Sequence, residues 1–339
     1  MPLSLWLEWN KAFLDMWDLT LVPWIKTEAF AQASGRGMES YLLLDTASSG
    51  LVRASMEEAH RMNVALVSKL SPKVGQTPRI LLWTKNKTRL YRYDRPAQVP
   101  VRYRTPLLIV YALINKPYIL DLIPQRSFIG AMVNRGIDVY LLDWGIPGPE
   151  DKHLRFDDLV MRYLPQVVQQ VLKASGEERL HILGYCIGGI LATLFAGARL
   201  LSLVGATAMF EEFATDEQAS SVWQAISLWA IDGVPFPGEA FRQLVRDLYQ
   251  GNKLINDQLT LASQPVHLSN ITIPILNVSV QEDYLVPPSQ VKPLFEKVSS
   301  TEKELVIVPG SHFALAIGQQ AVRNLWPREL DWLARHSRI

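Results

Sequence analysis

The amino-acid sequence predicts an α/β fold built on a mostly parallel central sheet with helices on both faces. Two observations support this prediction. After residue 78, short runs rich in β-branched and aromatic residues alternate with segments of helical periodicity. Most of these runs are continuously apolar, which is the pattern of strands buried on both faces. Because ligands bind at the carboxyl ends of the strands in such sheets, we expect functional side chains directly after strands.

The predicted elements alternate along the chain. Strands are expected, in order, at RILLWTK, TRLYRY, PLLIVYA, DVYLLD, RLHILGY, LVGATAMF, IPILNVSV and ELVIVPG. Helices are expected near residues 126–134, 158–175, 187–200, 238–250, 288–299 and 315–335. This alternation is typical of parallel sheets whose crossovers are helical, so residues 79–339 are predicted to form one α/β domain.

Residues 1–78 have a different pattern and are predicted to form a helical N-terminal region. Trp6, Trp9 and Phe13 recur at three- and four-residue spacing, and residues 38–70 hold a second, partly amphipathic helical stretch. The segment SPKVGQTP, residues 71–78, then has the composition of a linker.

Charge balance and cysteine count exclude several classes of protein. With 34 Lys and Arg against 33 Asp and Glu, no overall field would attract nucleic acid or an anionic membrane. No apolar run reaches the roughly 20 residues of a membrane-spanning helix, and the start lacks the basic segment of a signal peptide. A single cysteine and six scattered histidines predict neither an intramolecular disulfide nor a metal site. We therefore expect a cytoplasmic protein without a bound metal.

The segment HILGYCIGG holds the single cysteine between a predicted strand and a predicted helix. This context is that of a nucleophile elbow, in which glycines such as Gly184 and Gly188 let the chain turn sharply and expose the nucleophile. The helix after Cys186 would point its N–H groups at the sulfur and favour the reactive thiolate. Cysteine is also among the most buried residue types, so the motif taken alone supports a structural role equally well.

Candidate partners for Cys186 follow in the chain order nucleophile, acid, base. Asp283 comes just after IPILNVSV, and His312 lies in a glycine-containing loop after ELVIV. Because this is the order of the catalytic triads of α/β-hydrolases, the joint pattern predicts that fold, with Cys186, Asp283 and His312 as catalytic residues. Glu282 is an alternative acid that the sequence leaves open.

An oxyanion hole needs fixed donors that face the developing negative charge. By analogy with the nucleophile elbow, one donor is expected to be the backbone N–H of Ile187, directly after the nucleophile. Others are expected in the loop after PLLIVYA, at the backbone of Ala112 and Leu113.

Five motifs follow one another from about residue 79 to the C-terminus: PLLIVYALINKPYILDL, DVYLLDWGIPGPED, HILGYCIGGILA, PILNVSVQEDYLVPP and GSHFALAIG. Together they resemble those of polyhydroxyalkanoate synthases, closest to the short catalytic subunits of the two-subunit classes. The resemblance implies an acyltransferase that polymerises (R)-3-hydroxyacyl-CoA with release of CoA. Such an enzyme needs no separate cofactor, because CoA belongs to the substrate. By position, Cys186 matches the family nucleophile, Asp283 the acid and His312 the base. Implied partners are the growing polyester, a second synthase subunit, a second copy and the polymer granule surface.

The implied substrate explains why a cysteine stands at position 186. Exchange of a CoA thioester onto a cysteine sulfur gives another thioester, which keeps the acyl group activated for transfer to a hydroxyl. A serine ester would already have lost that driving force. Because water must be kept from such an intermediate, an apolar, covered pocket is expected.

The sequence departs from the family in three places. Only 97 positions separate Cys186 from Asp283, and the shortfall lies in a predicted cap insertion at about residues 207–265. A short cap is expected to leave the site more open, with weaker control over water and less need for an activation step. Tyr284 stands where the family has histidine. The N-terminal region is longer and richer in Trp, and its helices either pack on their own domain or form a surface for a partner.

Two alternative functions stay open at the level of sequence. The first is a hydrolase with a cysteine nucleophile, either a polyester depolymerase or an acyl-CoA thioesterase, which the short cap favours. The second is a non-catalytic scaffold of the same fold with a structural Cys186. If CoA is bound, Lys116, Arg242 and Arg246 are candidates to contact its phosphates, although such charges are more often a solvated helix face.

Overall fold

The computed structural model describes residues 73–198, 204–208 (backbone), 225–226, 228–229, 232–281, 283, 286–310, 312 and 314–339. The predicted helices before residue 73, Glu282, Tyr284 and most of the first half of the predicted cap lie outside these residues. The chain separates into two compact units, Met1–Pro72 with Trp223–Asp232, and Lys73–Val222 with Gly233–Ile339. The second unit carries the sheet described below, and the boundary at residue 78 and the short cap remain predictions.

An eight-stranded sheet forms the centre of the described residues, in the order β1-β2-β6-β3-β7-β8-β11-β12. The strands are β1 (Arg79–Lys85), β2 (Thr88–Tyr93), β3 (Tyr103–Val110), β6 (Ile137–Asp143), β7 (His181–Tyr185), β8 (Val204–Ala208), β11 (Ile275–Val280) and β12 (Lys303–Val308). From β6 to β12 all neighbours are parallel, whereas β2 is antiparallel to both β1 and β6. The predicted mostly parallel sheet is therefore confirmed.

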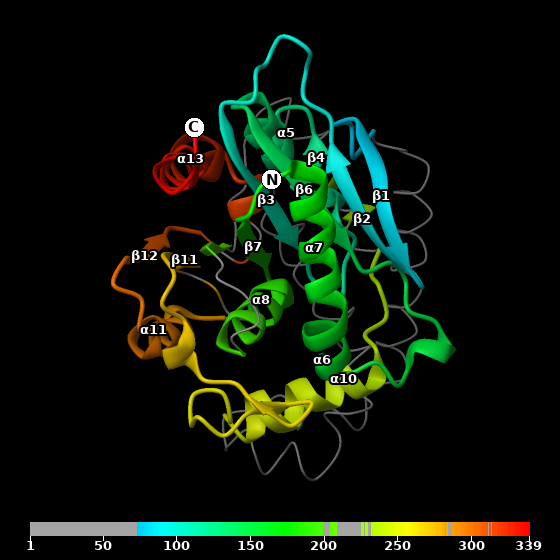
Figure 1. The fold of residues 1–339 in the computed structure, drawn as a ribbon, viewed down its shortest axis with the longest axis vertical. Coiled ribbons are helices and arrows are strands. Elements are labelled where there is room, and N and C mark those ends of the chain that lie inside the picture. Colours follow the sequence, from blue (N-terminus) through cyan, green and yellow to red (C-terminus); the bar gives the residue numbers. More distant parts are fainter. Residues whose placement is uncertain are drawn as a thin grey trace, which may run out of the picture. The chain divides into compact units, whose positions relative to one another are not determined.

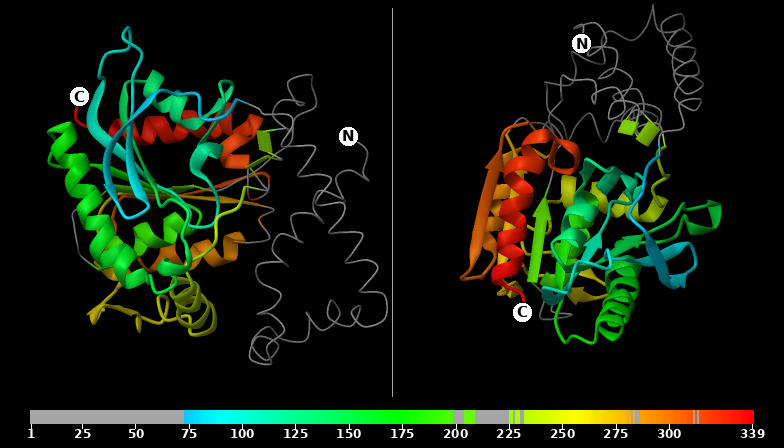
Figure 2. Two further views of the ribbon diagram at one scale, coloured as in Figure 1. Left: turned by 90° about the vertical axis from the view of Figure 1, so that its right-hand side faces the viewer. Right: turned by 90° about the horizontal axis from the view of Figure 1, so that it is seen from above.

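Helices cover both faces of the sheet (Figures 1 and 2). One face is covered by α5 (Phe128–Asn134) and α13 (Trp326–Arg335), and the other by α7 (Leu164–Ser175), α8 (Ile187–Gly197) and α11 (Pro288–Lys297). The central strands are therefore sealed from water, and Leu107, Leu108, Ile109 and Val110 of β3 are all 0% exposed. Burial of such continuous apolar runs is the main term that stabilises the domain. Among the described residues, no helix is long and apolar enough to cross a membrane.

Short elements complete the domain. They are η1 (Pro117–Leu120), β4 (Asp121–Ile123), β5 (Arg126–Ser127), η2 (Pro149–Asp151), α6 (Phe156–Asp158), η3 (Leu159–Tyr163), α10 (Gly238–Gln243), η4 (Leu244–Gln250), β9 (Thr260–Leu261), β10 (Gln264–Pro265), η5 (Leu268–Asn270), α12 (Ala314–Ile317) and η6 (Ala321–Leu325). Two helices begin or divide differently from prediction. The helix expected from residue 126 begins at Phe128, because Ser127 caps it by accepting a hydrogen bond from the Gly130 N–H. The helix expected over 315–335 divides after Ile317, at a glycine.

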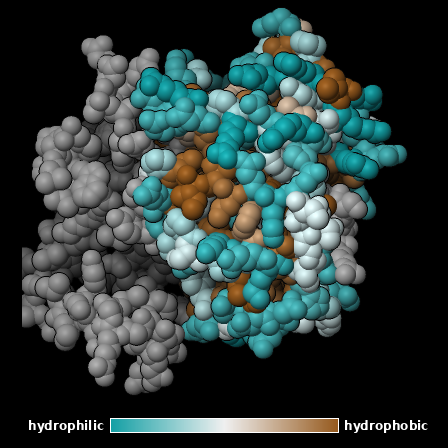
Figure 3. Space-filling view, turned by 90° about the vertical axis from the view of Figure 1, so that its left-hand side faces the viewer, coloured by the Kyte–Doolittle hydropathy of each residue, from teal (hydrophilic) through white to brown (hydrophobic). Residues whose placement is uncertain are grey.

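The two edge strands expose apolar side chains. Ile80 and Leu81 of β1 are 46% and 51% exposed, and Ile307 of β12 is 50% exposed. Figure 3 shows the side of the domain on which β12 ends the sheet, and there an apolar patch is surrounded by hydrophilic residues.

Gly188 sets how closely α8 can approach the end of β3. A Cβ atom at this position would lie 2.0 Å from the carbonyl oxygen of Val110 and 2.8 Å from that of Tyr111. Both neighbours are backbone atoms of a buried strand end, so they cannot move aside cheaply.

We predict that Gly188→Ala lowers the free energy of unfolding by about 3 kcal/mol, because α8 must move away from β3. Thermal and urea unfolding would measure the change. Gly238→Ala is the matched control, since a Cβ there would meet its nearest atom, the oxygen of Lys152, at 3.5 Å. Equal stability of the two variants would contradict the close approach.

Candidate active site

Cys186 occupies a strained turn between β7 and α8. Its backbone has φ 57° and ψ −128°, a combination that a residue with a side chain rarely adopts. A Cβ at Gly184 would lie 2.5 Å from the Cα of Gly189, so the strand and the helix touch across this turn. The geometry is that of a nucleophile elbow, as the glycine pattern predicts, and it positions the sulfur at the carboxyl end of the sheet.

The structure brings Cys186, His312 and Asp283 together from the ends of three strands. The Cys186 Sγ lies 3.9 Å from the His312 Nε2, and the His312 Nδ1 lies 3.0 and 2.9 Å from the two carboxylate oxygens of Asp283. His312 is 7% exposed and Asp283 is 4% exposed. The Asp283 Oδ1 also accepts a hydrogen bond of 2.8 Å from the Val286 N–H, which fixes the carboxylate.

These contacts define which ring nitrogen of His312 carries the proton. An ionised carboxylate can only accept hydrogen bonds, so Nδ1 is the N–H that donates to Asp283. In the neutral ring the lone pair is then on Nε2, which faces the sulfur. The arrangement can accept a proton from Cys186 and stabilise the imidazolium that results.

The surroundings of the Cys186 sulfur favour the neutral thiol over the thiolate. Burial raises the pKa of Cys186 to about 12, and the negative charge of Asp283 acts in the same direction, whereas a hydrogen bond from the Ile187 N–H lowers it. The N–H at the start of the helix acts in the expected direction, toward the thiolate, but desolvation has the larger effect on the pKa of Cys186.

The predicted oxyanion-hole residues lie beside the elbow. Ile187 is the first residue of α8, and its N–H points at the Cys186 sulfur. Ala112 and Leu113 follow β3 directly and are buried, next to the Tyr111 carbonyl that approaches Gly188. Their position beside the elbow fits the prediction. That their backbone N–H groups act as oxyanion donors remains a prediction.

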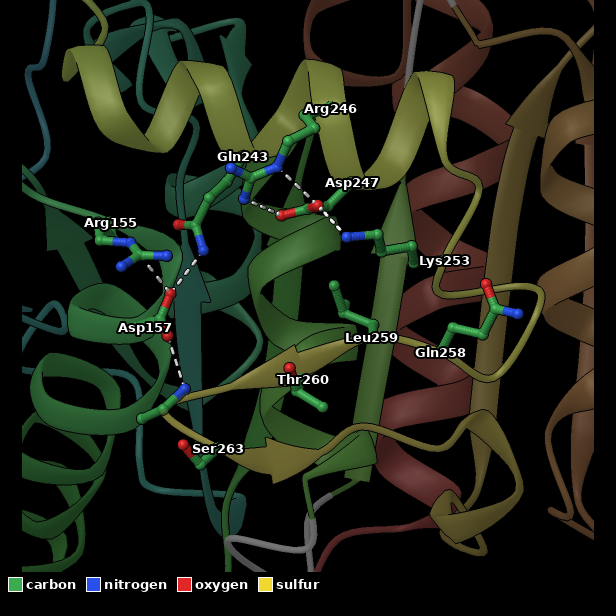
Figure 4. Close-up of a pocket in the computed structure, with 11 residues that line it drawn as sticks. Arg155, Asp157, Gln243, Arg246, Asp247, Lys253, Gln258, Leu259, Thr260 and Ser263 are labelled. Carbon is green, nitrogen blue, oxygen red and sulfur yellow. Dashed lines mark hydrogen bonds and ion pairs between the residues drawn. The ribbon is translucent and has the colours of Figure 1, made fainter.

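The predicted phosphate-binding cations have different surroundings. Arg242 is exposed and pairs with Glu239, and Lys116 precedes η1. Arg246 lines a polar cavity of about 380 Å³ between α6, η4 and the β9–β10 hairpin (Figure 4). Its guanidinium bonds Asp247 at 2.9 and 2.7 Å.

Carboxylates neutralise the cations of this cavity. Lys253 contacts the Oδ1 of Asp247, which Arg246 also bonds, at 2.6 Å, and Arg155 lies 3.6 Å from Asp157. Arg246, Lys253 and Arg155 are therefore already engaged, and the cavity leaves little positive charge for a phosphate.

One neighbour of the nucleophile was missed at the level of sequence. Desolvation and the charge of a Cys186 thiolate both raise the pKa of Tyr249, which is 63% exposed. Tyr249 belongs to η4, and no motif around VRDLYQ could have indicated this position. Among the described residues, no group of His, Cys, Asp or Glu side chains has the arrangement of a metal site.

Comparisons with known proteins agree on the fold. The family model for the alpha/beta hydrolase fold matches residues 105–251, and the model "Poly-beta-hydroxybutyrate polymerase (PhaC) N-terminus" matches residues 35–132. Monoglyceride lipase from Saccharomyces cerevisiae superposes with a TM-score of 0.54 at 14% identity, covering 79% of this chain and 98% of the lipase. The likeness at this identity concerns the fold alone.

Relatives of known sequence define the family more closely. The subunit PhaC of the poly(3-hydroxyalkanoate) polymerase of Haloferax mediterranei is 32% identical over 80% of this chain and 66% of its own length. That of Haloarcula marismortui is 31% identical over 78% of this chain and 69% of its own length. The PhaC subunit of Allochromatium vinosum is 29% identical over 76% of this chain and 89% of its own length. The chain thus spans about two thirds of the two haloarchaeal relatives, and it belongs to the poly(3-hydroxyalkanoate) polymerase (PhaC) family, a family of acyltransferases with the α/β-hydrolase fold.

Proposed function

We propose that the chain polymerises (R)-3-hydroxyacyl-CoA thioesters into polyhydroxyalkanoate through Cys186, His312 and Asp283. The observation that carries the proposal is the unbroken line of contacts from Asp283 through His312 to Cys186 in a chain of the polymerase family. The strained backbone of Cys186 supports it, because such strain is typical of nucleophile elbows.

The first step is acyl transfer from CoA to the protein. The Nε2 of His312 takes the proton of the Cys186 thiol while the sulfur attacks the carbonyl carbon. The N–H groups of Ile187, Ala112 and Leu113 are the proposed donors to the negative oxygen that forms. The bond from carbon to the CoA sulfur then breaks, and CoA leaves with the proton from His312. The product of this first step is an acyl thioester on Cys186.

The second step extends the polymer. A hydroxyl of a growing chain attacks the carbonyl of the acyl group on Cys186, and His312 takes the hydroxyl proton. The bond to the Cys186 sulfur breaks, and the proton returns to that sulfur. An oxygen ester forms and the free thiol is restored. In both steps Asp283 is proposed to orient the ring of His312 and stabilise its charged form.

The family also suggests where this reaction occurs and with what partners. We place the protein in the cytoplasm, at the surface of polymer granules, working without a separate cofactor. A second synthase subunit and a second copy of the chain are the proposed protein partners.

The proposal predicts that the purified chain releases CoA from (R)-3-hydroxybutyryl-CoA and forms polymer. Cys186→Ala should lower CoA release at least about a thousandfold, because the nucleophile is lost. Chromatography of CoA and mass analysis of the product would measure both. Ser175→Ala, at the end of α7, removes one oxygen far from the site and should leave the rate unchanged.

The product separates the alternatives. Free 3-hydroxybutyrate in place of polymer would contradict polymerisation and favour the hydrolase. CoA release that persists in Cys186→Ala would remove the nucleophile from the mechanism. If the wild-type chain releases no CoA even with a synthase partner subunit added, the non-catalytic scaffold is favoured.

The raised pKa of Cys186 predicts how alkylation depends on pH. The rate with iodoacetamide should rise about tenfold per pH unit from pH 7 to 10 without a plateau, because only the thiolate reacts and the pKa of the thiol is about 12. Since the chain has one cysteine, mass analysis of the intact protein reports this residue alone. Glutathione, with an ordinary thiol pKa, is the control. A plateau near pH 7 would instead reveal a preformed thiolate and imidazolium pair.

A further inference from the structure

Arg126 is a buried arginine without a carboxylate partner. It lies on β5 and is 8% exposed, and among the described residues its side chain has neither a hydrogen bond nor an ion pair. Arginine is rarely buried to this extent unless it is paired. By comparison, the less buried Arg92 bonds Asp138 twice, at 2.8 and 3.0 Å.

The one acid in the β4–β5 hairpin cannot serve as the partner of Arg126. Asp121 accepts hydrogen bonds of 2.8 Å from both the N–H and the hydroxyl of Thr77, and one of 2.6 Å from the Ser127 hydroxyl. These bonds occupy the carboxylate, and within the described residues none joins it to Arg126. The hairpin therefore presents a guanidinium that no neighbouring charge balances.

A second arginine adds to the positive charge. Arg323 lies on η6, is exposed, and has no ion pair within the described part of the chain. Burial lowers the pKa of Arg126, and the charge of Arg323 lowers it further, so the two guanidinium groups repel each other. A bound anion would relieve both the desolvation and the repulsion.

The position of this pair connects it to the active site. The short helix α12 begins two residues after His312, and it contacts both β5, which carries Arg126, and η6, which carries Arg323. Both arginines therefore lie on elements that contact α12, the helix that follows the loop of the proposed base. The pantetheine arm of CoA separates its thioester from its phosphates, so phosphate contacts at some distance from Cys186 are what a CoA thioester requires.

We propose that Arg126 and Arg323 form a binding site for phosphate groups, occupied during the reaction by the phosphates of the CoA thioester. Planar guanidinium groups bind phosphate through paired hydrogen bonds. In a 3-hydroxyacyl-CoA the phosphates are the only anionic groups, because the hydroxyl and the thioester are neutral. The identity of the ligand rests on the proposed function, whereas the preference for a phosphate anion rests on the two arginines.

The test compares four full-length proteins: wild type, Arg126→Met, Arg323→Met and Arg135→Met. Arg135 is the matched control, since it is exposed at the other end of α5 and loses the same charge. Calorimetric titration with CoA, dephospho-CoA, pantetheine and inorganic pyrophosphate gives the dissociation constants at one fixed salt concentration. Thermal unfolding of each variant serves as the second measurement.

The proposal expects Arg126→Met and Arg323→Met each to weaken CoA binding about tenfold or more. Pyrophosphate binding should be lost, pantetheine binding should be unchanged, and Arg135→Met should behave as wild type. The Tm of Arg126→Met should not fall, because methionine replaces an unpaired buried charge with an apolar chain. If the variants lose affinity for CoA but not for dephospho-CoA, the site binds the 3′-phosphate. If they lose affinity for both ligands equally, the site binds the pyrophosphate.

Other outcomes would overturn the site. Equal weakening of pantetheine and CoA, unchanged CoA binding in Arg126→Met, or no pyrophosphate binding by the wild type would each do so. The two proposals fail separately. Polymer synthesis with unchanged CoA affinity in Arg126→Met removes the phosphate site alone. Pyrophosphate binding that depends on Arg126, in a chain that makes no polymer, removes the proposed function alone.

Discussion

The position of Cys186, the proposed nucleophile, depends on the close packing of α8 against the end of β3. Because Gly188 lacks a Cβ atom, the first turn of the helix can contact the carbonyl groups of Val110 and Tyr111. This contact forces Cys186 into a positive-φ conformation, which the sheet on one side and the helix on the other maintain. The loop that continues from Tyr111 is thereby brought beside the sulfur, so one steric constraint positions both the nucleophile and the proposed oxyanion donors.

Burial has opposite effects on the two halves of the proposed triad. It strengthens the hydrogen bonds between His312 and Asp283, which water cannot weaken at 7% and 4% exposure. The same burial disfavours the charged form of Cys186 and raises its pKa to about 12. A thiol with a raised pKa reacts more slowly with alkylating and oxidising agents, which act on thiolates. In the proposed mechanism, the Cys186 thiol therefore loses its proton to His312 as the sulfur attacks the thioester.

Much of this arrangement could be predicted from the sequence, because its signals are local. The continuous apolar runs predicted the strands, and the order of Cys186, Asp283 and His312 after those strands predicted that they would meet at one edge of the sheet. What could not be predicted depends on contacts between distant segments. Nothing in the sequence around Arg246 indicates that Lys253 and Arg155 line the same cavity. Nor does it indicate that carboxylates in the cavity neutralise the three cations. The raised pKa of Cys186 could not be predicted either, because desolvation depends on which segments pack around the sulfur in the folded chain.

The contrast between two arginines shows why charge in a sequence is a weak guide to anion sites. Arg246 seemed the better candidate from its helical spacing, yet Asp247 occupies its hydrogen-bonding edge with bonds of 2.9 and 2.7 Å. Arg126 has no charge pattern around it, and its own hairpin supplies an acid that Thr77 and Ser127 already bind. A guanidinium group binds a phosphate well when its hydrogen-bond donors have no other partner in the folded protein. Its formal charge alone does not decide the free energy of binding. On that criterion, the two arginines beside α12 are better suited to the phosphates of CoA than the cavity that Arg246 lines.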